Sequence, residues 1–255
     1  MADTIPDPRQ ADVDAVQALL DQVERDGAVQ LPALSAAELG AVGAMRASLV
    51  DDQARSWWTA MAGGERATLS ATALQFLVHR RLLVPPEPGA GDDAERVALE
   101  VQPLLGVILA GRTRPAFVVL RREGTGGAPD RMRLYGIADE ARGLRCVLAE
   151  EATGKQVEGL GPGYLYVLAS TAEAIRSLIR WIGRAPVRVT TDADQASVIE
   201  VYRPDTGAGP ARRRILVTRG AAGLRIEGDR DARVIEGDEE DLRLLLSRTF
   251  ADLPA

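Results

Sequence analysis

The chain has 255 residues, a net charge of −6 and a hydrophobic share of 46%, which is typical of a globular protein with a substantial core. The acidic balance gives no general attraction to nucleic acid or to an anionic membrane. A single cysteine, Cys146, excludes an intramolecular disulfide, and the apolar runs are far shorter than the ~20 residues of a membrane span. Because the first residues also lack a secretory signal, we expect a cytoplasmic protein that does not contact a membrane.

The first 95 residues are expected to form a helical N-terminal region. Apolar residues at helical spacing predict helices over residues 13–23, 35–49, 53–62 and 65–81. Ser35-Ala-Ala-Glu38 is a capping box at the start of the second helix. The Pro- and Gly-rich segment 85–93 is predicted to be a linker, and a further helix is expected over residues 94–110. The strongest of these patterns is that of the fourth helix, in which Leu69, Ala73, Phe76, Leu77 and Arg80 recur at helical intervals.

From residue 96 onward, the sequence indicates two similar sheet units, residues 96–183 and residues 184–255. Each unit has strand-like runs, a Gly- and Pro-rich loop near its start and a closing amphipathic helix. The predicted strands are 115–122, 131–137, 143–149 and 164–169 in the first unit and 197–203, 212–218 and 223–227 in the second. A long Gly-rich loop is expected between residues 149 and 164. Ser170 and Asp238 are expected to cap the two closing helices.

The order of these pieces indicates an internal duplication. Gly143-Leu-Arg recurs as Gly223-Leu-Arg, 80 residues later (223 − 143), and a helix closes both units. Two unrelated hairpin regions are the alternative. Equivalent core positions are expected to be Leu134 with Ile215, and Leu178 with Leu245 or Leu246. The predicted fold class is therefore α+β, with a helical N-terminal third and two duplicated antiparallel sheet units that together form one domain.

No set of residues suggests catalysis or metal binding. His79 is the only histidine, so a common zinc site lacks ligands, and no Gly-x-Ser-x-Gly motif supplies the nucleophile of a Ser-His-Asp triad. Gly154-Lys155 lacks the upstream glycine and the following Ser or Thr of a phosphate-binding loop. The acidic run Asp238–Asp241 lies where a helix N-terminus favours negative charge. We therefore expect a protein that is not an enzyme, with no catalytic, metal-binding or cofactor-binding residues.

Two features are candidates for binding a protein partner. Trp57 and Trp58 are adjacent on a predicted helix, so they cannot both face one buried stripe. The loop 124–130 joins two predicted strands and is rich in glycine, as is common for recognition loops held by a rigid sheet. The candidate partner-binding residues are Thr125, Gly126, Arg131, Tyr135, Trp57 and Trp58.

Arginines recur on one predicted sheet face together with Tyr135. They are Arg131, Arg133, Arg145, Arg212, Arg214 and Arg225. Such a face is compatible with nucleic-acid binding. Acidic neighbours and the negative net charge favour a solvated sheet face instead, so we do not expect nucleic acid as a partner.

The order of elements resembles the EspG family, the cytosolic specificity chaperones of type VII (ESX) secretion in actinobacteria. The matching segments are the helix from Glu65-Arg66 to Val84, the strands 117–122 and 132–137, the segment 142–148, and the ending 214–218 and 242–253. This resemblance implies an α+β fold and a secretion-associated chaperone whose clients are PE–PPE-like secreted proteins. The chain differs from the family between Gly183 and Val187, where it lacks the helical insertion that usually separates the two sheet units.

Two functions are compatible with these observations. The first is a non-enzymatic cytosolic protein-binding protein, favoured by the scarcity of catalytic residues and by the resemblance. The alternative is a DNA-binding regulator of the helix-turn-helix or winged-helix type over residues 53–84, in which residues 82–84 begin a wing. Its second helix offers few basic residues, mainly Arg66, Arg80 and Arg81. We therefore favour the protein-binding function.

Overall fold

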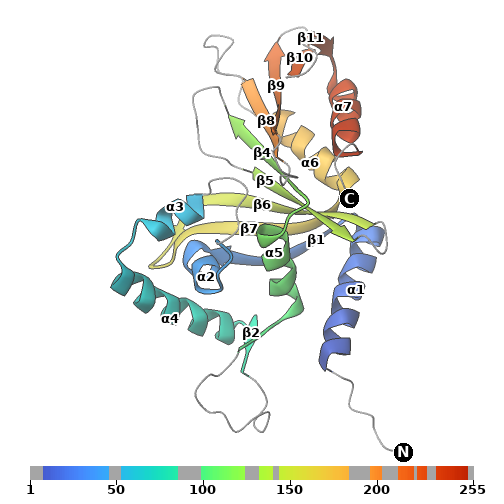
Figure 1. The fold of residues 1–255 in the computed structure, drawn as a ribbon. Coiled ribbons are helices and arrows are strands. Elements are labelled where there is room, and N and C mark those ends of the chain that lie inside the picture. Colours follow the sequence, from blue (N-terminus) through green and yellow to red (C-terminus); the bar gives the residue numbers. More distant parts are fainter. Residues whose placement is uncertain are drawn as a thin grey trace, which may run out of the picture.

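The computed structural model shows a mixed α+β fold built on one large antiparallel sheet (Figure 1). The structure describes residues 8–45, 53–85, 99–123, 132–139, 144–183, 196–202, 212–220, 223–228 and 234–251. The sheet has nine strands in the order β1-β7-β6-β5-β4-β8-β9-β10-β11. The strands are β1 (Ala28–Ser35), β4 (Phe117–Glu123), β5 (Met132–Asp139), β6 (Leu144–Val157), β7 (Gly161–Ser170), β8 (Ala196–Tyr202), β9 (Arg212–Gly220), β10 (Gly223–Gly228) and β11 (Val234–Gly237). A separate small sheet pairs β2 (Leu83–Val84) with β3 (Glu100–Val101).

Helices cover the two faces of the sheet in different places (Figure 1). They are α1 (Pro8–Asp26), α2 (Ala36–Ala41), α3 (Gln53–Thr59), α4 (Gly63–His79), α5 (Pro103–Thr113), α6 (Thr171–Gly183) and α7 (Glu239–Ala251). Alternate residues of β4 point into two separate cores. Val118 and Leu120 join the N-terminal core, which contains residues of α1 to α5 and of β1. Phe117 and Val119 join the C-terminal core, which contains residues of α6 and α7.

Several predicted boundaries are wrong, in most cases because strand pairing decides them. β1 lies in the region that was predicted to be helical and pairs with β7, with Ala28 opposite Ala169. The helix expected over residues 94–110 begins at Pro103, because residues 100–101 pair with β2. The helix expected over residues 35–49 ends at Ala41. The loop expected between residues 149 and 164 is instead a long β6–β7 hairpin, and β11 was not predicted.

The two closing helices agree with the sequence prediction. Ser170 Oγ accepts a hydrogen bond from the Glu173 amide at 3.2 Å. Asp238 Oδ1 accepts bonds from the amides of Glu240 and Asp241 at 2.8 and 3.1 Å, which satisfies N–H groups that a helix start leaves unpaired. The buried stripes of α6 and α7 are Ala174, Ile175, Leu178, Ile179 and Ile182, and Leu242, Leu246 and Phe250. Within the described ranges, no helix is both long enough and apolar enough to span a membrane.

A buried ion pair joins α5 to the sheet. Arg112 of α5 donates to the Glu150 carboxylate of β6, and each residue is only 3% exposed. Tyr166 Oη donates to Glu150 Oε2 at 2.8 Å and accepts from Arg112 Nη1 at 3.3 Å. Tyr135 Oη donates to Glu150 Oε1 at 3.2 Å. These additional hydrogen bonds offset part of the cost of removing two charges from water.

We expect Arg112→Met to lower the free energy of unfolding by about 3–5 kcal/mol, because the Glu150 carboxylate is left buried without its cation. The double variant Arg112→Met/Glu150→Leu should recover a large part of this loss, since both charges are then gone. Urea denaturation followed by circular dichroism measures both changes. Arg225→Met is the control, because its ion pair with Glu227 is exposed and such pairs contribute at most ~1 kcal/mol. A double variant no more stable than Arg112→Met would contradict this account.

Candidate protein-binding groove

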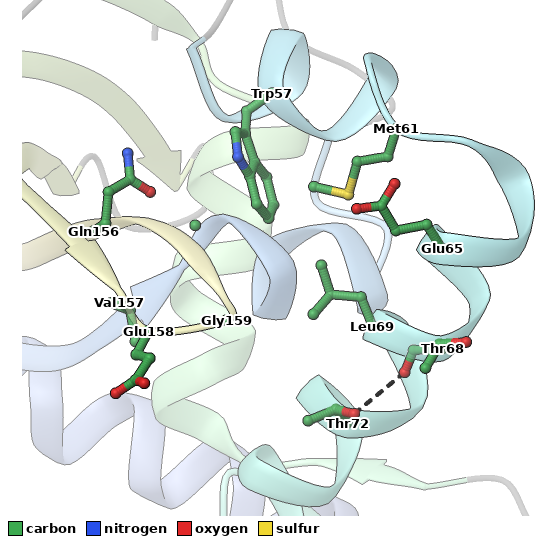
Figure 2. A pocket seen from close by; sticks show the side chains of 11 residues that line it. Trp57, Met61, Glu65, Thr68, Leu69, Thr72, Gln156, Val157, Glu158 and Gly159 are labelled. Atoms are coloured by element: carbon green, nitrogen blue, oxygen red, sulfur yellow. Dashed lines mark hydrogen bonds between the residues drawn. The ribbon is translucent and has the colours of Figure 1, made fainter.

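A groove with a volume of about 590 Å³ lies between α4 and the tip of the β6–β7 hairpin, beside the end of α3 (Figure 2). Its lining residues are Trp57, Met61, Glu65, Thr68, Leu69, Thr72, Gln156, Val157, Glu158, Gly159 and Gly161. Figure 2 shows Leu69 of α4 facing the hairpin across the groove. The groove therefore has one helical wall and one hairpin wall.

The hairpin wall is held by its own turn and by α2. The Leu160 amide donates to the Val157 carbonyl at 2.9 Å, which closes the turn. Gly159 and Gly161 have φ angles of +70° and +79°, in the left-handed region that favours glycine. The Ala37 amide donates to the Leu160 carbonyl at 3.1 Å and connects the hairpin tip to the first turn of α2. The hairpin tip is thus fixed relative to the N-terminal helices.

Each of the two adjacent tryptophans packs against a glycine. A Cβ atom on Gly161 would lie 2.4 Å from the Trp57 ring, and one on Gly40 would lie 2.5 Å from the Trp58 ring. The two ring centroids are 6.4 Å apart. Trp57 therefore packs on the hairpin and Trp58 on α2, which explains how both are partly buried although they are neighbours on one helix. Trp57 lines the groove, and Trp58 packs α3 against α2.

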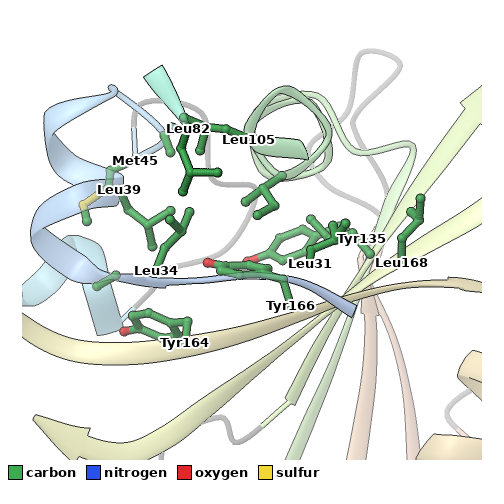
Figure 3. Packing of buried hydrophobic residues seen from close by; sticks show 14 of the residues in the cluster. Leu31, Leu34, Leu39, Met45, Leu82, Leu105, Tyr135, Tyr164, Tyr166 and Leu168 are labelled. Carbon is green, nitrogen blue, oxygen red and sulfur yellow. The ribbon is translucent and has the colours of Figure 1, made fainter. Parts of the chain in front are cut away.

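The helical wall is anchored at the C-terminal end of α4. Arg80 Nη1 donates to Glu38 Oε1 at 2.8 Å, and its Nη2 donates to the Ala33 carbonyl at 2.7 Å. Glu38 also completes the predicted capping box, because its carboxylate accepts from the Ser35 amide at 2.7 Å. Leu39 and Leu34 of the same segment belong to the N-terminal core shown in Figure 3. A buried carboxylate thus connects α2, α4 and the end of β1.

The face of α4 that lines the groove through Glu65, Leu69 and Thr72 continues beyond the groove to the apolar Phe76. At 100° per residue, Glu65, Leu69, Thr72 and Phe76 fall within about 60° of one another around the helix. Phe76 is 46% exposed, although it recurs at helical spacing with the buried Ala73 and Leu77. Ala73 and Leu77 lie on the adjacent face and are fully buried. The sequence signal that could have indicated this site is the presence of Leu69 and Phe76 beside the buried Ala73 and Leu77, since together they make an apolar face wider than α4 buries.

Carboxylates border the groove on both walls. Glu65 extends from α4 and Glu158 from the hairpin turn, on opposite sides in Figure 2. Both side chains are exposed, and neither forms an ion pair with a described residue. None of the eleven lining residues is basic. The described residues contain no group of three or more His, Cys, Asp or Glu side chains that could hold a metal. The groove thus offers an apolar floor and acidic borders to a bound molecule.

The prediction that Tyr135 lies on a solvent-exposed sheet face is wrong. This residue is 3% exposed and contacts the buried Arg112–Glu150 pair. Arg133 of the same face is also buried, at 6% exposure. This face is covered by helices of the N-terminal region, which the alternation of the strand could not reveal. Arg225 of the second half is exposed and pairs with Glu227, as expected for a solvated face.

The other predicted positions have different outcomes. Thr125, Gly126 and Arg131 lie outside the described residues, so their binding role stays a prediction. Cys146 is buried on β6, where burial raises the pKa of its thiol and the negative charge of Glu24 raises it further. A thiol held in its neutral form is a poor nucleophile.

No protein-family model matches the sequence, and no curated protein matches it at a significant level. The function is therefore inferred from the chain's own residues and from their arrangement.

We expect Gly161→Ala to destabilise the protein more than Gly159→Ala. Both residues have positive φ, so alanine is strained at either position by about 1–2 kcal/mol. A Cβ on Gly161 also meets the Trp57 ring, whereas a Cβ on Gly159 has no neighbour within 4 Å. Urea denaturation measures both losses, and a shift of the native tryptophan emission should accompany only Gly161→Ala. Equal losses and unchanged emission would show that Trp57 does not pack there.

Proposed function

We propose that this protein is a non-enzymatic, cytosolic protein-binding protein, and that the groove between α4 and the β6–β7 hairpin holds its partner. The observation that carries this proposal is a set of accessible apolar side chains: Leu69 and Val157 lie on opposite walls of the groove, and Phe76 lies on α4 beyond it. Buried contacts hold both walls in place. Accessible apolar surface with a polar border is characteristic of protein interaction sites. The proposal agrees with the resemblance to EspG-like chaperones, for which the partner is a PE–PPE-like secreted client.

We expect Phe76→Ser/Val157→Ser to weaken partner binding at least tenfold, because buried apolar anchors usually dominate interface energies. The partner is first captured from native lysate and purified, and its Kd is then measured by isothermal calorimetry. Leu165→Ser/Leu244→Ser is the matched control, since these side chains are 41% and 42% exposed and do not line the groove. The melting temperatures of both variants should be close to that of the wild type. Equal binding by both variants would place the interface elsewhere.

A DNA-binding regulator is the second candidate, favoured by the order α3, α4 and the β2–β3 pair, which resembles a helix-turn-helix with a wing. The basic side chains of this segment are few. Arg80, one of them, donates to Glu38 and to the Ala33 carbonyl. Phosphate contacts by Lys and Arg supply most non-specific DNA affinity, so few free cations predict weak binding. Salt-dependent binding to duplex DNA of mixed sequence would favour this candidate over the first.

We further propose that β4–β7 with α6 and β8–β11 with α7 are copies of one module. β4 and β8, the first strands of the two runs, are adjacent in the sheet. The later strands of each run follow outward in chain order, β5 to β7 on one side and β9 to β11 on the other. Leu120 pairs with Glu200, 80 residues later (200 − 120), at the junction of the two runs. The closing helices both have 13 residues. Matching Gly143-Leu-Arg to Gly223-Leu-Arg would align Cys146 with Ile226. These side chains lie on opposite faces of the sheet, since Cys146 joins the N-terminal core and Ile226 the C-terminal core, so this motif match is out of register by one residue.

The duplication predicts how the two runs superpose in an experimentally determined structure. Leu134 should fall on Ile215, since they pair with Val119 and Ile199, which are themselves 80 residues apart (199 − 119). Leu178 should fall on Leu246, because each is the eighth residue of its helix. A best superposition that shifts either pair to another strand or another helical turn would contradict a common origin.

A further inference from the structure

Building on the proposed function, we infer that the groove binds a basic amphipathic helix, with an apolar stripe flanked on both sides by Lys or Arg. Three properties of the groove carry this inference. They are the charge of its borders, the spacing of the apolar residues along the adjoining face of α4, and the irregular backbone of the hairpin wall.

The charges favour a cationic partner. Glu65 and Glu158 lie on opposite walls, are exposed, and form no ion pair with a described residue. An acidic peptide would bring like charges together at both borders, which is unfavourable. The whole chain adds to this preference, because it has 37 acidic and 31 basic residues. A net negative field accelerates the approach of a positively charged partner. Cationic residues on both sides of the partner's stripe would match both walls.

The spacing favours a helix. Leu69 and Phe76 are seven residues apart on α4, or about 10.5 Å along the axis at 1.5 Å per residue. A partner helix lying along α4 places apolar residues i and i+7 at the same separation. Its intermediate i+3 or i+4 residue then faces Thr72. Grooves that bind amphipathic helices use anchors at this spacing.

The hairpin wall is poorly suited to binding an extended strand. β6 continues beyond its pairing with β5, which ends at Glu151 opposite Met132, so its outer edge is not covered by β5 there. The register shifts between Ala152 and Gln156, and Gly154 within this bulge has a φ of +68°. Thr153 Oγ1 also accepts a hydrogen bond from the Lys155 amide at 3.2 Å. An edge interrupted in this way does not present the regular row of N–H and C=O groups that an added strand requires.

The first experiment selects 16-residue peptides from a random display library on the immobilised full-length chain. Peptides that also bind Leu69→Glu/Phe76→Glu are removed, because that variant has lost the apolar anchors. We expect the remaining peptides to be net cationic, to have apolar residues at i, i+3 or i+4 and i+7, and to gain helical circular dichroism when bound. Groove-dependent peptides that are acidic, uncharged or extended would overturn the inference and leave the proposed function intact. A library that yields no groove-dependent peptide would count against both.

The second experiment reverses the charges of the groove. Glu65→Lys/Glu158→Lys should weaken a selected cationic peptide about tenfold, mainly through a slower association rate. The same peptide with its Lys and Arg replaced by Glu should bind the reversed variant better than the wild type. Glu24→Lys/Glu100→Lys is the matched control, since it changes the net charge equally at exposed positions outside the groove. Equal weakening in the control would show that only the net charge matters, and that outcome would overturn the assignment of Glu65 and Glu158.

Discussion

The central strands of the sheet are apolar on both faces, and the need to cover both faces positions the other elements. On β4, Val118 and Leu120 point to one side while Phe117 and Val119 point to the other. All four are at most 5% exposed. Burying such a side chain is worth about 1.5–3 kcal/mol, so an uncovered face would be strongly destabilising. The N-terminal helices cover one face of the first run of strands, and the closing helices α6 and α7 cover the other face.

The groove follows from this arrangement. The β6–β7 hairpin extends beyond the end of β5 and therefore needs support from elements outside the sheet. Ala37 of α2 and Trp57 of α3 provide that support at the hairpin tip. α4 packs on α2, where Ala73 clusters with Ala37, and Leu69 of α4 faces the hairpin across the groove (Figure 2). The groove is thus the space left where the helical layer extends past the edge of β5.

Local signals in the sequence predicted local structure well. The capping residues Ser35, Ser170 and Asp238 are found at helix starts, and the stripes of α6 and α7 are buried. Contacts between distant segments could not be predicted in the same way. Alternation along β5 shows that Arg133 and Tyr135 share a face, but not that helices from the N-terminal region cover that face. Similarly, the sequence indicates that Trp57 and Trp58 must diverge, whereas their glycine partners lie far away along the chain.

The two halves of the sheet differ in the burial of one face, at positions that the proposed duplication makes equivalent. Arg133 and Arg214 occupy matching positions, because Arg133 pairs with Leu120 of β4 and Arg214 pairs with Glu200 of β8. In the first half, this face lies under the N-terminal helices, and Arg112 of α5 supplies the cation that the buried Glu150 requires. In the second half, Arg225 and Glu227 remain exposed on the same face and pair with each other. The N-terminal region therefore turns a solvated, charged face into a protein interior. Because that same region supplies α3 and α4, it also gives the first half a groove that the strands alone would not form.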